Sequence, residues 1–156
     1  MMNKIQKLAY KKMLFDNSVE LLKQRIALSE ALIKEAQLTA NEEEKSSAGD
    51  KYETSRAMSH IQKEMYSKQL SANQNELVSL LTIDHTTLHT SIIPGTVIKC
   101  SDYTFFIAAG LGKLVQECET IFLISPLAPL SLVLSAKNVN DSFKFNNTDI
   151  IIKDLF

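Results

Sequence analysis

The sequence is poor in the residues that interrupt regular structure. Its 156 residues include only four glycines and three prolines. Gly49 is the only glycine in the first ninety residues, and no proline comes before Pro94. Because glycine and proline are the residues that most often break helices, their scarcity leaves the first half of the chain free to form long helices. Gly49 is then the one flexible position between them.

The sequence also lacks the features of several other protein classes. Cys100 and Cys118 are too few and too isolated for a disulfide framework or a thiolate metal site, and we expect both to be reduced and mostly buried. The apolar runs are far shorter than the ~20 residues that cross a bilayer. Lysines interrupt residues 1–15, which argues against a signal peptide. The formal net charge of −1 argues against a strongly basic nucleic-acid-binding surface. We therefore expect a cytoplasmic protein with no membrane partner.

The first half of the chain has the apolar spacing of two helices. From Ile5 onward, residues three and four apart are mostly apolar, which is the pattern of a coiled-coil seam. This pattern predicts one long helix that ends near Lys45. A weaker stripe predicts a second helix from Tyr52 to about Leu81. The predicted seam of the first helix includes Ile5, Leu8, Lys12, Phe15, Val19, Leu22, Ile26, Ser29, Ile33, Ala36 and Ala40, and that of the second includes Ala57, Ile61, Met65, Leu70, Leu77 and Leu81.

Two amphipathic helices joined by a short loop bury each other's apolar faces when they fold back. The sequence therefore predicts an antiparallel helical hairpin over residues 1–82, with its tip at residues 46–53. At the tip, Asp50 and Glu53 are three residues apart near a helix start, so both point to the same side. Considered without any family, Asp50 is a helix cap and Glu53 closes a loose capping box.

After Pro94 the sequence is typical of β-structure. β-branched and aromatic residues predict strands at 95–100, 103–108, 120–124, 141–145 and 149–156. Asn146 and Asn147 predict a tight turn, and Pro129–Ala136 predicts a short helix opened by proline. We interpret Gly110–Lys113 as a turn between strands. Residues 83–156 are thus predicted to form a small antiparallel sheet with one short helix, and the fold class is α+β.

This layout resembles that of the bacterial Gre transcript-cleavage factors. The tip residues Gly49-Asp50-Lys51-Tyr52-Glu53 match the family's Gly-Asp-x-x-Glu. In the second half, the matching residues are Ile124-Ser125, Ala128-Pro129-Leu130, Ala136-Lys137 and Asn140-Asp141. Two positions depart from the family pattern: Arg56 stands where an acidic residue is usual, and Asn140 stands where glycine is usual. The resemblance implies that residues 83–156 are an FKBP-like domain.

The resemblance also implies a function. Gre factors insert the hairpin through the secondary channel of RNA polymerase, where the tip acids, here Asp50 and Glu53, complete a second Mg²⁺ site that activates a water. The water hydrolyses backtracked RNA near its 3′ end. The factor is then not itself an enzyme, binds no Mg²⁺ alone and has no small-molecule substrate. Lys45, Lys51 and Arg56 would lie near RNA phosphates. The docking segment at the channel rim would include Ser125, Pro126, Ala128, Pro129 and Leu130.

Two alternatives stay open at this point. A channel-binding regulator could insert the same hairpin without stimulating cleavage. A coiled-coil interaction protein with no link to the polymerase would have the same apolar spacing.

Overall fold

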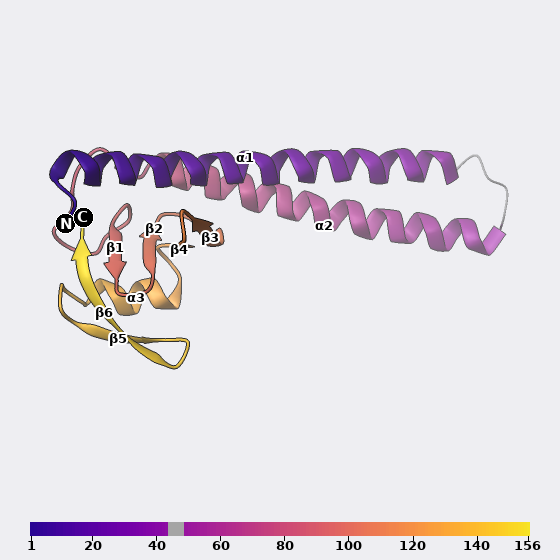
Figure 1. Cartoon of the computed structure of the whole chain (residues 1–156). Helices are drawn as coiled ribbons and strands as arrows, with labels where there is room; N and C mark the ends of the chain where they lie inside the picture. Colours follow the sequence, from indigo (N-terminus) through magenta and orange to yellow (C-terminus); the bar gives the residue numbers. More distant parts are fainter. Residues whose placement is uncertain (44–48) are drawn as a thin grey trace. The chain divides into compact units, whose positions relative to one another are not determined.

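The computed structural model describes residues 1–43 and 49–156, and the side chains of residues 1–42 and 53–156. Figure 1 shows the nine elements. They are α1 (Lys4–Glu43), α2 (Gly49–Leu81), β1 (Val97–Cys100), β2 (Thr104–Ile107), β3 (Gly112–Gln116), β4 (Glu119–Ile124), α3 (Pro129–Ser135), β5 (Ser142–Phe145) and β6 (Thr148–Leu155). The predicted α+β class is confirmed.

The chain groups into two compact units, residues 1–21 with 78–156 and residues 22–77. We call the first the sheet unit and the second the hairpin unit. α1 belongs in part to each unit, so the boundary between the units does not coincide with the end of a helix. The predicted domains, residues 1–82 and 83–156, stay a prediction.

The hairpin unit consists of the later part of α1 and most of α2, packed against each other (Figure 1). Leu22, Ser29 and Ala36 are buried on α1 at intervals of seven residues, as the coiled-coil pattern predicts. Among the described residues of α2 in this unit, Ser59 is buried; Leu80, nearer the end of α2, is buried within the sheet unit. The paired helices of the prediction are confirmed, and mostly small side chains form their seam.

The predicted seam of α2 is wrong in its first half and at its last residue, Leu81, which is exposed. Ala57, Ile61 and Met65 are exposed, whereas Ser59 is buried and Tyr66 is half-buried. Serine at the seam makes the buried face less apolar than the exposed one, so a count of apolar residues selects the wrong side. The seam of α1 is also wrong at its start, where Ile5 and Lys12 are exposed.

The sheet unit contains one six-stranded sheet with the order β3-β4-β2-β1-β6-β5. We predicted an antiparallel sheet, and this is wrong for one pair, because β2 and β4 are parallel. The cause is β3, a strand that we took for a turn. The chain passes from β2 to β3 at the edge and returns in β4, which lies between them and runs in the direction of β2.

The sheet is covered on both faces within its unit. On one face Leu134 of α3 packs with Ile98, Phe105 and Ile150, among other buried apolar residues. On the other face the first turns of α1 contact the sheet: Lys7 pairs with Asp154 at 2.6 Å, and Tyr10 lies edge-on to Phe156. Within the described residues, no helix combines the length and the apolar character needed to cross a bilayer.

Candidate functional site

The two acidic residues of the predicted site lie at the start of α2. Asp50 is the second residue of this helix and Glu53 the fifth. The carboxylate of Glu53 is exposed. The side chain of Asp50 lies outside the described residues. A helix N-terminus is a favourable place for acidic residues in general.

The basic residues predicted near RNA are less fully described. Arg56 is exposed on α2, one turn after Glu53 and on the same side of the helix. Lys45 and the side chain of Lys51 lie outside the described residues. Farther along α2, the Nζ of Lys63 donates a hydrogen bond to Oε1 of Gln37 at 2.6 Å, so Lys63 ties the two helices together.

The second predicted site is the segment between β4 and α3, and hydrogen bonds fix its conformation. The carbonyl oxygen of Ser125 accepts from the Oγ of Ser131 at 2.6 Å and from the backbone N–H of Ala128 at 3.0 Å. The Oγ of Ser125 accepts from the N–H of Leu127 at 3.2 Å. Ala128 is the N-cap and Pro129 the first residue of α3, which confirms the predicted helix. The segment is therefore a rigid corner.

Not all residues of this corner can contact a partner. Leu130 packs against the core, and Pro126 is half-buried. Leu127 is exposed, at 86%, and Pro129 is exposed as well. The predicted docking loop, from Ser125 to Leu130, spans Leu127, which the prediction did not name. Leu132 and Val133 of α3 extend this exposed apolar surface.

A polar cluster that no sequence pattern indicates surrounds Glu119, within the sheet unit. Its carboxylate accepts hydrogen bonds from Lys99, from Thr104 and, at 2.8 Å, from the hydroxyl of Tyr10. The Nζ of Lys99 also lies 4.0 Å from the ring centroid of Tyr10. Burial raises the pKa of Glu119, but the hydrogen bonds from Lys99, Thr104 and Tyr10 outweigh it and hold the pKa below its ordinary value. Burial, with Glu119, raises the pKa of Tyr10. This cluster fixes α1 on the sheet.

A second polar cluster surrounds Lys11, which is fully buried. Its Nζ donates to the carbonyl oxygen of Thr87 at 2.7 Å and lies 3.3 Å from Nδ1 of His89. Burial lowers the pKa of Lys11 to about 8, with Asp84 opposing the shift. Asp84 accepts hydrogen bonds from the hydroxyls of Thr86 and Thr87, and these hold its pKa below the ordinary value. The cluster positions the connection between α2 and β1.

The two cysteines differ in exposure. Cys100 is half-buried, and burial raises the pKa of its thiol to about 11. Cys118 is exposed, so the expectation that both are mostly buried is wrong for this residue. Both are free thiols and line one hollow of about 240 Å³ in the sheet unit. Across the described part of the chain, no three or more His, Cys, Asp or Glu side chains are grouped so that they could hold a metal ion.

Comparisons with protein-family models, with curated proteins and with solved structures find no match for this chain. The likeness to the Gre factors therefore depends on the layout of the chain and on its two motifs.

Proposed function

We propose that this protein is a Gre-type transcription elongation factor, which binds RNA polymerase through the secondary channel and stimulates cleavage of backtracked RNA. One observation carries the proposal. Asp50 and Glu53 occupy the first two turns of a helix that packs antiparallel to α1, so the acids are at one end of a helical pair. Such an arrangement suits the delivery of carboxylates into a narrow channel.

The chemistry of the proposal needs a metal that the polymerase shares with the factor. Two carboxylates alone are a poor Mg²⁺ site, because Mg²⁺ requires octahedral oxygen coordination. Asp50 and Glu53 would supply ligands from one side, and the polymerase would supply the rest. When bound, a second Mg²⁺ activates a water for attack on the phosphodiester. The role of this chain is to hold its two carboxylates in position.

The same proposal assigns a docking role to the corner between β4 and α3. Its rigid backbone and the exposed Leu127 support a contact with a protein surface. Describing residues 83–156 as an FKBP-like domain, and the protein as cytoplasmic, belongs to this proposal as well.

Arg56 favours one alternative, a channel-binding regulator that does not stimulate cleavage. Arg56 comes three residues after Glu53 in α2, so the two side chains leave the helix on the same side. A positive charge close to the carboxylates weakens their attraction for Mg²⁺. The third possibility, a coiled-coil protein that does not bind the polymerase, has the support of the helical pair alone.

Transcript cleavage in stalled elongation complexes distinguishes these functions. We expect the natural protein to accelerate cleavage, and Asp50→Ala or Glu53→Ala to reduce the rate at least about tenfold, which corresponds to about 1.4 kcal/mol of transition-state stabilisation. The matched control is Glu42→Ala, which removes an exposed acidic residue near the end of α1 and should leave the rate unchanged.

The outcomes separate the three possibilities. Binding to the polymerase without acid-dependent cleavage would favour the regulator, and Arg56→Glu would then be the variant to test for a gain of cleavage. Failure to bind purified polymerase in a pull-down would reject both polymerase-dependent functions.

A further inference from the structure

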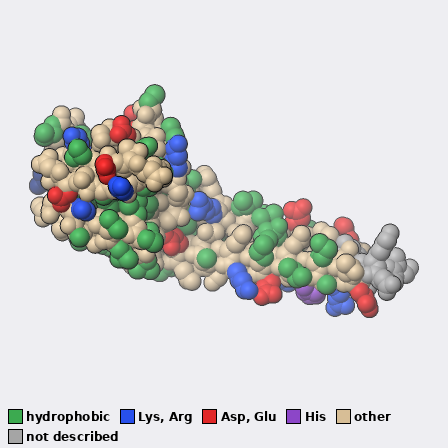
Figure 2. Space-filling view, turned by 90° about the horizontal axis from the view of Figure 1, so that it is seen from below, with side chains coloured by type: hydrophobic (Ala, Val, Ile, Leu, Met, Phe, Trp, Pro, Cys, Tyr) green, Lys and Arg blue, Asp and Glu red, His purple; other side chains and the backbone are tan. Residues whose placement is uncertain are grey.

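The hairpin unit exposes large hydrophobic side chains that its own seam does not use. Among its described side chains they are Leu28 (60% exposed), Leu38 (55%), Met58 (59%), Ile61 (66%) and Met65 (46%). Figure 2 shows hydrophobic side chains gathered along the hairpin. Apolar patches on a protein surface mark interaction sites when their side chains share one face.

The heptad positions place these five side chains on one face. With the buried Ser29, Ala36 and Ser59 at position a, Leu28, Met58 and Met65 occupy position g, and Leu38 and Ile61 occupy the adjacent position c. In an antiparallel helical pair the g positions of both helices flank the seam on the same side. We call this surface the apolar face.

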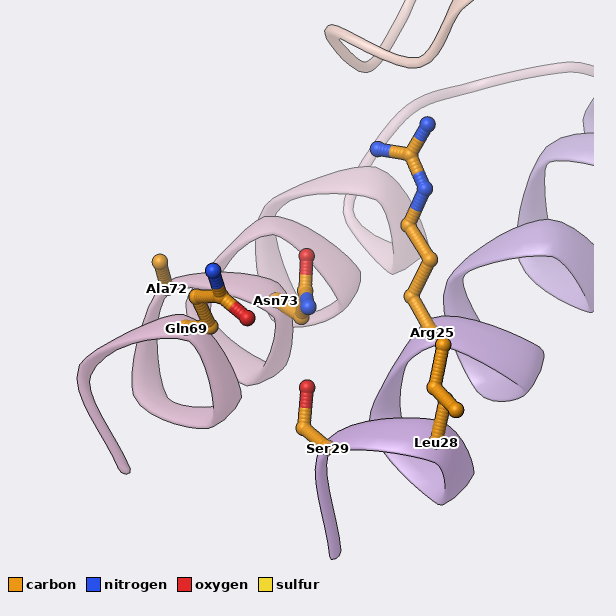
Figure 3. Close-up of a pocket in the computed structure, with 6 residues that line it drawn as sticks. All are labelled: Arg25, Leu28, Ser29, Gln69, Ala72 and Asn73. Carbon is orange, nitrogen blue, oxygen red and sulfur yellow. The ribbon is translucent and has the colours of Figure 1, made fainter. Parts of the chain in front are cut away.

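A hollow supports this assignment. Leu28 lines a hollow of about 300 Å³ together with Ala72, the g residue opposite it, and with the seam residues Ser29 and Asn73 (Figure 3). In Figure 3 the side chains of Ser29 and Asn73 point into the space between the two helices. Small and polar side chains at the seam leave the hollow open on the apolar face.

The apolar face also carries charges of both signs at defined levels. Gln37 is level with Lys63, as their hydrogen bond shows, so Glu35 is level with Met65. The exposed Lys68 lies three residues farther along α2, or ~4.5 Å along the axis. Lys68 already forms an exposed pair with Glu64 at 3.0 Å, of the kind that contributes little.

We propose that the apolar face binds a second copy of this chain. A two-fold axis along the hairpin places α1 of each copy on α2 of the other at the same levels. Leu38 then meets Ile61 of the second copy, and Leu28 enters the hollow beside its Ala72. Glu35 comes within about one helical turn of its Lys68. The charges and the hollow are thus self-complementary, as a symmetric dimer requires. The inference is independent of the proposed function, because it depends only on the hairpin.

Analytical ultracentrifugation of the full chain, over a wide range of concentration, tests this dimer. We expect a concentration-dependent dimer, and we expect Leu38→Asp or Ile61→Asp to weaken it at least about tenfold. Gln74→Asp is the control, because Gln74 is exposed at position b, on the side of α2 away from positions g and c. Circular dichroism of each variant checks that the helices are retained.

Charge reversal tests the pairing itself. Glu35→Lys and Lys68→Glu should each weaken the dimer, because each brings like charges together across the interface. An equimolar mixture of the two variants should recover association, because the mixed dimer restores an opposite-charge pair at both places. A chain that stays monomeric at all concentrations, or a dimer that Ile61→Asp leaves unchanged, would overturn the proposal.

Discussion

The fold leaves no room for a side chain at Gly95. Its φ is +95°, and a Cβ atom there would lie 2.7 Å from the carbonyl oxygen of Asp84 and 2.8 Å from Cγ2 of Ile83. We expect Gly95→Ala to lower the free energy of unfolding by about 2–4 kcal/mol, from left-handed backbone strain and steric overlap together. Urea denaturation measures the change.

Gly112 provides the control, because its φ of +86° is similar but no atom lies within 4 Å of an added Cβ. Gly112→Ala should cost about 1 kcal/mol from backbone strain alone. Equal losses for the two variants would show that the contacts with Asp84 and Ile83 have no effect on stability.

His89 should make the protein sensitive to mild acid. Burial and the nearby Lys11 cation hold the pKa of His89 below its ordinary value, although Asp84 opposes this. A lowered pKa means that the fold favours neutral His89. The resulting stability is fully present above the unfolded-state pKa of about 6.5 and is lost as the pH falls through the folded-state pKa.

When the pH is lowered from about 7.5 to about 5.5, the urea concentration at the unfolding midpoint should therefore decrease more in the natural protein than in His89→Gln. His60→Gln is the matched control, since His60 is exposed on α2, and it should leave the pH dependence unchanged. If His89→Gln keeps the full acid sensitivity, the loss has another origin.

The sequence predicted some of these backbone conformations and missed others. Asn146 and Asn147 have φ of 50° and 63°, which confirms the predicted turn, and Asn140 has φ of 75°. Asparagine tolerates positive φ, so an asparagine in the sequence indicates where such an angle can occur. Glu117 and Cys118 also have positive φ, of 48° and 66°, and neither residue type indicates it.

The turn at Glu117 and Cys118, between β3 and β4, explains why the sequence did not predict β3. Without asparagine or glycine between them, β3 and β4 have no hairpin signal in the sequence. Gly110 and Gly112 suggested a turn a few residues earlier. The parallel pairing of β2 with β4 depends on β3, so a single missed turn changed the predicted sheet from mixed to antiparallel.

The β3–β4 turn is a place where the protein can be stabilised. Glu117→Asn with Cys118→Gly introduces the residues that this backbone prefers, and we expect a gain of about 1 kcal/mol. Thermal denaturation measures the gain. Asn147→Gly, in a turn that already has suitable residues, should have a smaller effect. A lower melting temperature for the double variant would contradict the expectation.

The ends of the helices were predicted well, but the side of each helix that is buried was predicted less well. The second helix ends at Leu81 as expected, because its length follows from the absence of glycine and proline. The position of the seam on α2 depends on Ser59, whose burial no apolar pattern indicates. The position of Asp50 and Glu53 at a helix start was predictable, whereas the polar clusters around Lys11 and Glu119 join residues far apart in sequence and were not.

The two units differ in how much apolar surface each of them buries in its own interior. Phe105, Phe106 and Ile98 are fully buried in the sheet unit. Among the described residues of the hairpin unit, Leu22 is the one large apolar side chain that is buried, and the other buried residues are Ser29, Ala36 and Ser59. Local opening should therefore cost less in the hairpin. We expect amides of residues 53–77 to exchange hydrogen faster than those of β1 and β2, as measured by mass spectrometry. Equal protection in both units would contradict this.

Self-association and the proposed function would use the same helices. A dimer through the apolar face would cover part of the hairpin that the proposed function places in the polymerase channel. High concentrations of the protein should then reduce its action on stalled complexes, and Ile61→Asp should remove this inhibition.

The sheet unit takes its first twenty-one residues from before the hairpin and the rest from after it. The ion pair of Lys7 with Asp154 and the bonds of Tyr10 and Lys11 join these two stretches without any covalent link. A protease that nicks the hairpin would therefore leave two fragments still bound to each other. The natural chain already has the design of a split protein, whose halves could be produced separately and reassembled.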